Sequence, residues 1–265
     1  TLDAGGANIT FVNTLDGNAT LDLNTTGTIT FAGQVGNTTA LDSLNTSAGS
    51  TANIATAVVK TTGPQQYAGA ITLAECTTLE ATLVTNNGTI TGNGKSLTVS
   101  GNALVAGAIQ GVGDYAVTGN ATLAANVTTS GTQVYSGPVV LSGGDRVLNG
   151  STITTASTVD GGGSNGLEIT GNAIVQGPVS NITDLAISGT SSIGANVTTS
   201  GTQLYSNAMT LTADVTLNGT TVTTGAAVLG NNNSLTIEGA AAVGGNVSLV
   251  TNFAVSGNAT INAAS

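Results

Sequence analysis

The chain reads Thr129-Ser130-Gly131-Thr132-Gln133-Val134-Tyr135 near its middle, and closely related heptapeptides stand at 61–67 and 199–205. The tyrosines that end the three copies are therefore spaced at roughly 70 residues. A fixed internal period is the strongest sequence indication of a repeat architecture. We therefore expect a fold built from repeated units and not from one irregular globular core.

Apolar residues recur at matching places behind each heptapeptide. Leu97-Thr98-Val99 aligns with Leu167-Glu168-Ile169 and with Leu235-Thr236-Ile237, and all three alternate between apolar and polar residues. This period of two is typical of a strand with one buried face, and no segment shows the 3.6-residue stripe of a helix. The extra residues of the middle copy fall at Gly143-Gly144 and at 161–163, so we interpret the Gly-rich pieces as turns.

Glycine corners recur at a finer spacing, shown by the interval between Gly101 and Gly119. This spacing predicts an all-β fold, a right-handed parallel β-helix of about 17–18 residues per coil, with about four coils in each large repeat. The asparagine at each corner either bonds along the helix axis through its amide or tolerates a left-handed backbone, and both interpretations stay open. The predicted corners are Gly101-Asn102, Gly119-Asn120, Gly171-Asn172 and Gly257-Asn258.

A β-sandwich is the competing fold, because short alternating strands separated by turns fit it too. A sandwich has no reason to repeat at the fixed spacing of the corners, so the solenoid is favoured. We expect one continuous β-solenoid over 1–265, with divergent coils at 1–60 and large repeats at 61–128, 129–198 and 199–265. The last repeat is incomplete, which predicts a fragment of a longer chain or filament, partnered by further coils of the same or identical chains.

Composition restricts chemistry severely. Lys and Arg total three, Asp and Glu total thirteen, and His is absent, so charged residues make up 6% of the chain. General acid–base catalysis and metal binding draw on residues that are scarce here, and a net charge of −10 opposes binding to nucleic acid. Cys76 has no cysteine to pair with, and no apolar run has the length of a membrane span. We expect no enzyme, no metal, no cofactor and no membrane insertion.

The chain resembles the repeat regions of filamentous-haemagglutinin-like exoproteins, which are long adhesins of bacterial surfaces. The resemblance rests on the Thr-Thr-Ser-Gly-Thr-Gln-x-Tyr segments at 128–135 and 198–205, on Leu217-Asn218-Gly219-Thr220-Thr221-Val222-Thr223-Thr224, on the Leu-Thr-Ile-x-Gly stretch at 235–239, and on a strand-and-turn segment at 31–41. It implies a right-handed parallel β-helix shaft, located outside the cell, that extends a distal binding region, and it supplies no catalytic residue.

Two other functions stay open beside the shaft. One is a self-assembling extracellular filament or surface-layer subunit; the other, more remote, is a carbohydrate-active β-helix enzyme, which the scattered carboxylates disfavour. Glycans of host cells, neighbouring cells or matrix are candidate partners of an adhesin of this kind.

The repeat tyrosines Tyr67, Tyr135 and Tyr205 are the most distinctive side chains in a chain with four Tyr. The residues four and six positions after each of them are apolar, so strand alternation places the rings on the inward face. We expect buried rings whose hydroxyls reach water or a turn carbonyl. The rival interpretation is an exposed row of tyrosines that binds sugars.

Overall fold

The computed structural model describes residues 1–262, and over this range the chain consists of strands and turns without any helix. The strand pairs within each compact unit described below are all parallel, and successive coils of about 19 residues stack to give about 14 coils in total. The predicted β-solenoid is thereby confirmed in place of the sandwich, whose hairpins would pair antiparallel strands. Within 1–262 no helix is long and apolar enough to cross a membrane.

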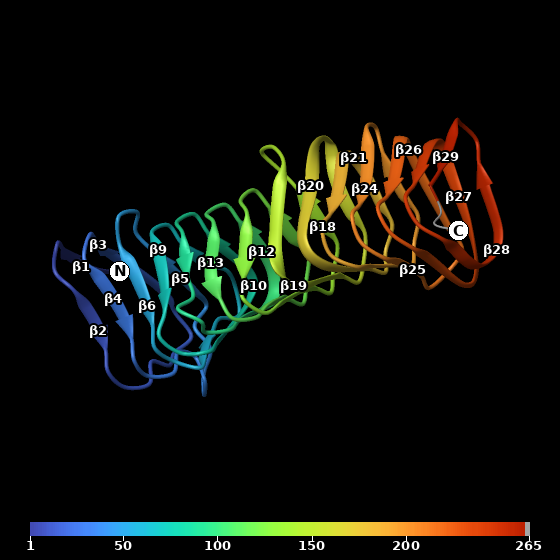
Figure 1. Ribbon diagram of the computed structural model, residues 1–265. Helices are drawn as coiled ribbons and strands as arrows, with labels where there is room; N and C mark the ends of the chain where they lie inside the picture. Colours follow the sequence, from blue (N-terminus) through green and yellow to red (C-terminus); the bar gives the residue numbers. More distant parts are fainter. Residues whose placement is uncertain (263–265) are drawn as a thin grey trace. The chain divides into compact units, whose positions relative to one another are not determined.

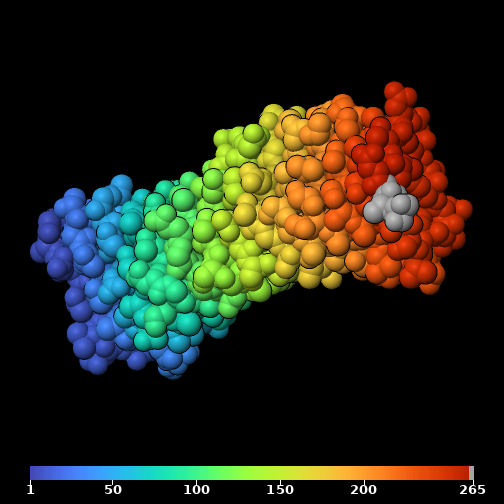
Figure 2. Space-filling model, viewed as in Figure 1, coloured from blue at the N-terminus to red at the C-terminus, as the bar shows by residue number. Residues whose placement is uncertain are grey.

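The chain divides into two compact units, Thr1–Ser136 and Gly137–Ser265. In each unit the strands of successive coils lie side by side and point the same way (Figure 1). Within each unit, the atoms of successive coils form a continuous surface on the face drawn in Figure 2.

Unit 1 has three faces, each a ladder of parallel strands. The first face consists of β1 (Leu2–Gly5), β3 (Thr20–Thr25), β5 (Ser43–Thr46), β8 (Gln65–Tyr67), β15 (Ala121–Leu123) and the second halves of β10 (Thr77–Asn86) and β12 (Leu97–Val105). The second consists of β2 (Ile9–Phe11), β4 (Thr28–Phe31), β6 (Thr51–Ile54), β9 (Ala70–Leu73), β11 (Ile90–Thr91), β13 (Ile109–Val112) and β16 (Val127–Thr129). The third consists of β7 (Val58–Lys60), the first halves of β10 and β12, β14 (Tyr115–Val117) and β17 (Thr132–Tyr135).

Unit 2 follows the same plan with longer strands, because several of them bend from one face to the next at a shift in strand register. Its strands are β18 (Val139–Leu141), β19 (Arg146–Thr155), β20 (Val159–Val175), β21 (Val179–Ile187), β22 (Ser191–Ile193), β23 (Val197–Thr199), β24 (Thr202–Tyr205), β25 (Met209–Leu211), β26 (Val215–Thr224), β27 (Val228–Val243), β28 (Val247–Val255) and β29 (Ala259–Ile261).

The core is the inside of the coil, filled by the alternate residues of every strand. The burial of β9, for example, alternates between half-buried and buried residues, with Ile71 and Leu73 inward and Thr72 outward. Inward side chains stack on their counterparts in the next coil, as Ile71 does on Ile90 and Ile90 on Ile109. Stacking of like residues at the strand spacing of about 4.8 Å lets the core fill without voids.

Most coils are slightly longer than the corner spacing predicts. Along one inner row of unit 1, Thr46, Tyr67, Asn86, Val105 and Leu123 pair in succession, and the coils between them differ in length. The Gly-Asn corners mark the shortest coils, and other coils carry extra turn residues. Because the mean coil has about 19 residues, a large repeat spans about 3.7 coils, and not four.

This mismatch moves each copy of the large repeat round by one face. Tyr67 lies in β8 on the first face of unit 1, whereas Tyr135 lies in β17 on the third. In unit 2, Leu148 belongs to the inner row of Tyr205, while its sequence counterpart Leu217 belongs to the row of Val197. Equivalent residues of successive repeats thus wind around the solenoid and do not form a single row.

A glycine bulge occurs once in each large repeat, inside long strands that the sequence suggested would be corners. Gly101, Gly171 and Gly239 have φ values of 136°, 134° and 132°, and each stands opposite two residues of the preceding strand. A Cβ at any of these positions would overlap a carbonyl oxygen of that strand. Only glycine fits both the dihedral and the space, and the bulge turns the strand from one face to the next.

A second special backbone position carries three different residues. Gly111, Asn181 and Leu249 occupy the same place in β13, β21 and β28, with φ values of 63°, 54° and 51°. A left-handed backbone is free for glycine, tolerable for asparagine and unfavourable for leucine. The Leu249 side chain is 62% exposed, so packing does not offset the strain.

Leu249→Gly should therefore raise the free energy of unfolding of the last described coils by about 1 kcal/mol, because glycine relieves the left-handed strain. The control is Ser248→Gly, one residue earlier in the same strand, which should lower stability by about 0.5–1 kcal/mol. Hydrogen exchange of the β27 and β28 amides measures both. Equal losses of protection in the two variants would contradict the strain at Leu249.

Candidate functional site: a buried Gln–Tyr network

The tyrosine of each heptapeptide is enclosed by the core, with no exposed surface at Tyr67, Tyr135 or Tyr205. The expectation of buried rings is confirmed, and an exposed tyrosine row for sugars is excluded by the same observation. The predicted partners of the hydroxyls, water or a turn carbonyl, are wrong. Each hydroxyl donates to the side-chain oxygen of the glutamine two residues earlier, at 3.0, 3.0 and 2.9 Å in the three copies.

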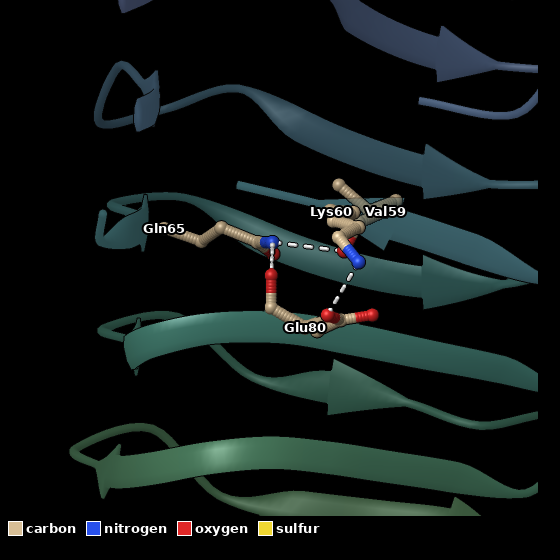
Figure 3. A network of polar contacts seen from close by, with 4 residues as sticks. All are labelled: Val59, Lys60, Gln65 and Glu80. Carbon is tan, nitrogen blue, oxygen red and sulfur yellow. Dashed lines mark hydrogen bonds and ion pairs between the residues drawn. The ribbon is translucent and has the colours of Figure 1, made fainter. Parts of the chain in front are cut away.

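That glutamine bridges two coils from inside the core. Gln65 is fully buried, and its Nε2 donates to the Val59 carbonyl at 2.9 Å and to the Glu80 carbonyl of the next coil at 3.1 Å (Figure 3). The third copy repeats the arrangement, with Gln203 Nε2 bonded to Val197 and Asn218 carbonyls at 3.1 and 2.7 Å. Glu80 and Asn218 are the residues just before the bulges opposite Gly101 and Gly239, where the strand ladder is interrupted. The glutamine amide supplies donors where the backbone changes direction.

The first threonine of each heptapeptide forms a hydrogen bond within the same corner. The hydroxyls of Thr61, Thr129 and Thr199 donate to the carbonyls of the glycines two residues later, at 2.7, 3.1 and 3.1 Å. Gln133 and Gln203 also reach the threonine hydroxyl, at 3.4 Å in both copies. Threonine, glutamine and tyrosine thus form one buried chain of hydrogen bonds, which leaves the polar groups of the corner satisfied.

An aspartate of the preceding coil lies beside the glycine of the heptapeptide and accepts hydrogen bonds from its second threonine. Asp184 Oδ1 accepts hydrogen bonds from the Thr202 amide at 2.6 Å and the Thr202 hydroxyl at 2.7 Å. Asp114 binds the Thr132 amide and hydroxyl in the same way, at 2.7 and 2.9 Å. A side chain in place of Gly201 would collide with Asp184, which explains why glycine stands there.

The first copy lacks this carboxylate contact for a chemical reason. Pro64 occupies the place of Thr202, and proline has neither an amide hydrogen nor a hydroxyl to offer an aspartate. Instead, the Lys60 ammonium lies 2.7 Å from the Glu80 carboxylate, on the outside of the same corner (Figure 3). Both side chains are about 40% exposed, so this ion pair contributes little stability.

At the predicted Gly-Asn corners, the glycine and the asparagine have different structural roles. Asn102 Oδ1 accepts from the Asn120 amide at 2.9 Å, and Asn172 Oδ1 accepts from the Thr190 amide at the same distance. The left-handed dihedrals belong to Gly101 and Gly171 and not to the asparagines. Of the two interpretations left open, bonding along the axis therefore describes Asn102 and Asn172.

Two further predicted corners stack tightly on the coil before. The amide of Gly119 donates to Gly101 and that of Gly257 to Gly239, at 2.9 and 3.1 Å. A side chain on either glycine would meet the backbone below it. Asn120 and Asn258 contribute their main-chain carbonyls, which accept from Ala103 and Ala241, both at 2.8 Å.

Two other aspartates, to which the sequence assigned no role, also accept hydrogen bonds from backbone amides of the following coil. Asp145 Oδ1 accepts from the Gly166 amide at 2.6 Å, and Asp214 Oδ1 accepts from the Ser234 amide at 2.7 Å. Within residues 1–262 no three Asp, Glu, Cys or His side chains gather where they could hold a metal ion.

The electrostatics of the network follow from burial and hydrogen bonding. Desolvation raises the pKa of the Tyr67, Tyr135 and Tyr205 phenols far above the ordinary value, so they stay neutral. Hydrogen bonds from Thr202, first from its amide and then from its hydroxyl, lower the pKa of Asp184 below its ordinary value of 3.8. The Thr132 amide and hydroxyl lower the pKa of Asp114 likewise. At neutral pH the phenols are therefore neutral and the two carboxylates ionised, and both kinds of group are engaged in hydrogen bonds within the coils.

Comparison with known protein families, curated proteins and solved structures finds nothing that matches this chain. The resemblance to exoprotein repeats therefore rests on the residues quoted above, and the β-solenoid itself rests on the strand pairing.

Gln65→Leu should lower the free energy of unfolding by about 2–5 kcal/mol, because it leaves the buried Tyr67 hydroxyl without a partner and removes the bonds that Gln65 donates to the Val59 and Glu80 carbonyls. Gln66→Leu is the matched control, since this neighbouring side chain points outward and the third copy has Leu204 at its place. It should change stability by less than about 0.5 kcal/mol. Urea unfolding followed by circular dichroism separates the two.

A double-mutant cycle of Gln65→Leu with Tyr67→Phe tests whether the pair acts as a unit. We expect a coupling free energy of about 1 kcal/mol or more, since removing either partner already breaks the shared hydrogen bond. Additive effects would show that the hydroxyl and the amide stabilise the coil independently.

Thermal stability should fall in acid as the corner carboxylates take up protons. A pKa lowered in the folded state gives stability that is present above the unfolded value near 3.8 and lost as the pH falls through the folded one. Asp114→Asn together with Asp184→Asn should flatten the melting temperature below about pH 4. Asp42→Asn, which removes an exposed carboxylate with no hydrogen bond in the described chain, should leave the acid slope unchanged.

Proposed function

We propose that the chain is a structural segment of an extracellular bacterial surface adhesin, in which it serves as a β-solenoid spacer that holds a distal binding region away from the cell. One observation carries the proposal: the glutamine and tyrosine of the motif present in three copies are buried, and their polar groups bind other parts of the coil. A repeated motif whose glutamine and tyrosine face the interior stabilises the stack of coils.

The use of the carboxylates supports the same role. Glycosidases and lyases on β-helices need paired carboxylates free to exchange protons or hold a cation. Here Asp114, Asp145, Asp184 and Asp214 each bind a backbone amide of the following coil. Their cohesive role favours a spacer over an enzyme.

The proposed location outside the cell draws on the resemblance to exoprotein repeats, and the absence of a disulfide partner for Cys76 requires stability from packing and hydrogen bonds. Cys76 is a free, exposed thiol, and within each unit the ladder and corner hydrogen bonds join successive coils without a disulfide.

Removal of residues 131–200 tests the spacer directly. The new junction of Ser130 with Gly201 reproduces the native Ser-Gly step, and Asp114 then meets Thr202 as it now meets Thr132. The variant should fold, unfold at a similar urea concentration, and be shorter by about 18 Å, because it loses about 3.7 coils at about 4.8 Å each. Small-angle scattering measures the change in length and in cross-section.

A shortened variant that fails to fold, or one whose length does not change, would contradict a modular spacer. Concentration-dependent polymerisation of the unaltered chain in sedimentation experiments would favour a filament subunit instead. Duplication of 131–200 is the matched control and should lengthen the molecule by the same amount.

A further inference from the structure

A notch opens on one edge of unit 2 where three consecutive coils differ in corner length. In β20 four residues, 161–164, separate Asp160 from Asn165, whereas in β21 Asn181 alone separates their partners Ser180 and Ile182. The corner at 161–164 therefore projects beyond the corner at Asn181. The resulting space of about 210 Å³ is lined by Gly163, Asn181, Ile182, Thr198, Thr199 and Ser200.

The polar groups that face this notch are all uncharged. Asn181 Nδ2 donates to Asp160 Oδ1 at 3.1 Å, which fixes the amide and leaves its carbonyl oxygen available. Thr198 and Ser200 are exposed, and within residues 1–262 their hydroxyls have no hydrogen-bond partner. The Thr199 hydroxyl is already engaged by Gly201 and Gln203. One acceptor and two hydroxyls, each able to donate and accept, therefore remain for a ligand.

The fold does not require the Asn181 side chain. Gly111 adopts the same left-handed backbone with no side chain at all, and Leu249 adopts it with an apolar one. The asparagine carries a backbone cost that glycine would avoid, and strain of this kind is often retained at binding sites.

We propose that this notch binds one residue of a neutral glycan. Its volume is below the roughly 300–1,000 Å³ of pockets for drug-sized ligands, so it accommodates a single sugar ring. Vicinal hydroxyls match a site that both donates and accepts. A charged ligand fits less well, because no charged side chain lines the notch and the net charge of −10 repels anions.

The affinity of so open a site should be weak, with a Kd in the millimolar range. Titration of the isotopically labelled chain with the methyl glycosides of glucose, galactose, mannose and N-acetylglucosamine, followed by NMR, measures it. At least one should produce saturable shifts of the Asn181, Thr198 and Ser200 amides, while glucuronic acid should not. Absence of saturable shifts with all four up to about 100 mM would overturn the proposal.

Asn181→Gly is the decisive variant, because it removes the amide while keeping the backbone that Gly111 shows to be compatible. It should bind at least tenfold more weakly and melt at the same or a higher temperature. Ser200→Ala should weaken binding as well, whereas Thr190→Ala, on another corner, should not. Equal binding by Asn181→Gly and the unaltered chain would show that the notch is not the site, and neither result bears on the length test of the spacer.

Discussion

The backbone hydrogen bond from one coil to the next is the interaction on which this structure depends. Parallel strands satisfy it along the faces, but at bulges and at several corners the ladder is interrupted, and some amides and carbonyls there need other partners. Side chains supply partners at those points: Asp184 accepts a hydrogen bond from the Thr202 amide, Asn102 accepts one from the Asn120 amide, and Gln203 donates to the Asn218 carbonyl. The polar residues that are repeated are those that complete the ladder.

The same requirement connects the polar residues of the large repeat to its bulge. In the third copy a bulge, a buried glutamine and a capping aspartate form a set, because Gln203 donates to the carbonyl that precedes the bulge and Asp184 accepts hydrogen bonds from the threonine next to Gln203. The set can recur wherever three strands meet in the same order, and this does not demand a whole number of coils. Because each repeat advances by one face, the bulge glycines and buried tyrosines are spread around the solenoid and no face accumulates them.

Much of the fold could be predicted from the sequence, because alternation and glycine spacing are local signals. Leu97-Thr98-Val99 identifies a strand, and Gly101 a break in it, without knowledge of any partner. The coil length was harder to predict from the sequence, because the spacing from Gly101 to Gly119 represents only the shortest coils. The partner of Tyr67 was missed for another reason: Gln65 looks like an ordinary polar residue until the turn folds it inward. Its presence two residues before all three tyrosines was the available signal.

The outward side chains are the part least predictable from the sequence, because the hydrogen bonds of the strand ladder do not constrain which residues stand there. At the left-handed position shared by Gly111, Asn181 and Leu249 the backbone demand is constant, and glycine alone would meet it without strain. A side chain there projects beside the corner, where it contributes no ladder bond. Variation among the three copies is therefore tolerated by the fold at a modest cost, and it changes what each corner presents to solvent. A solenoid whose interior is fixed can acquire binding sites in this way, one corner at a time, while the stack itself is preserved.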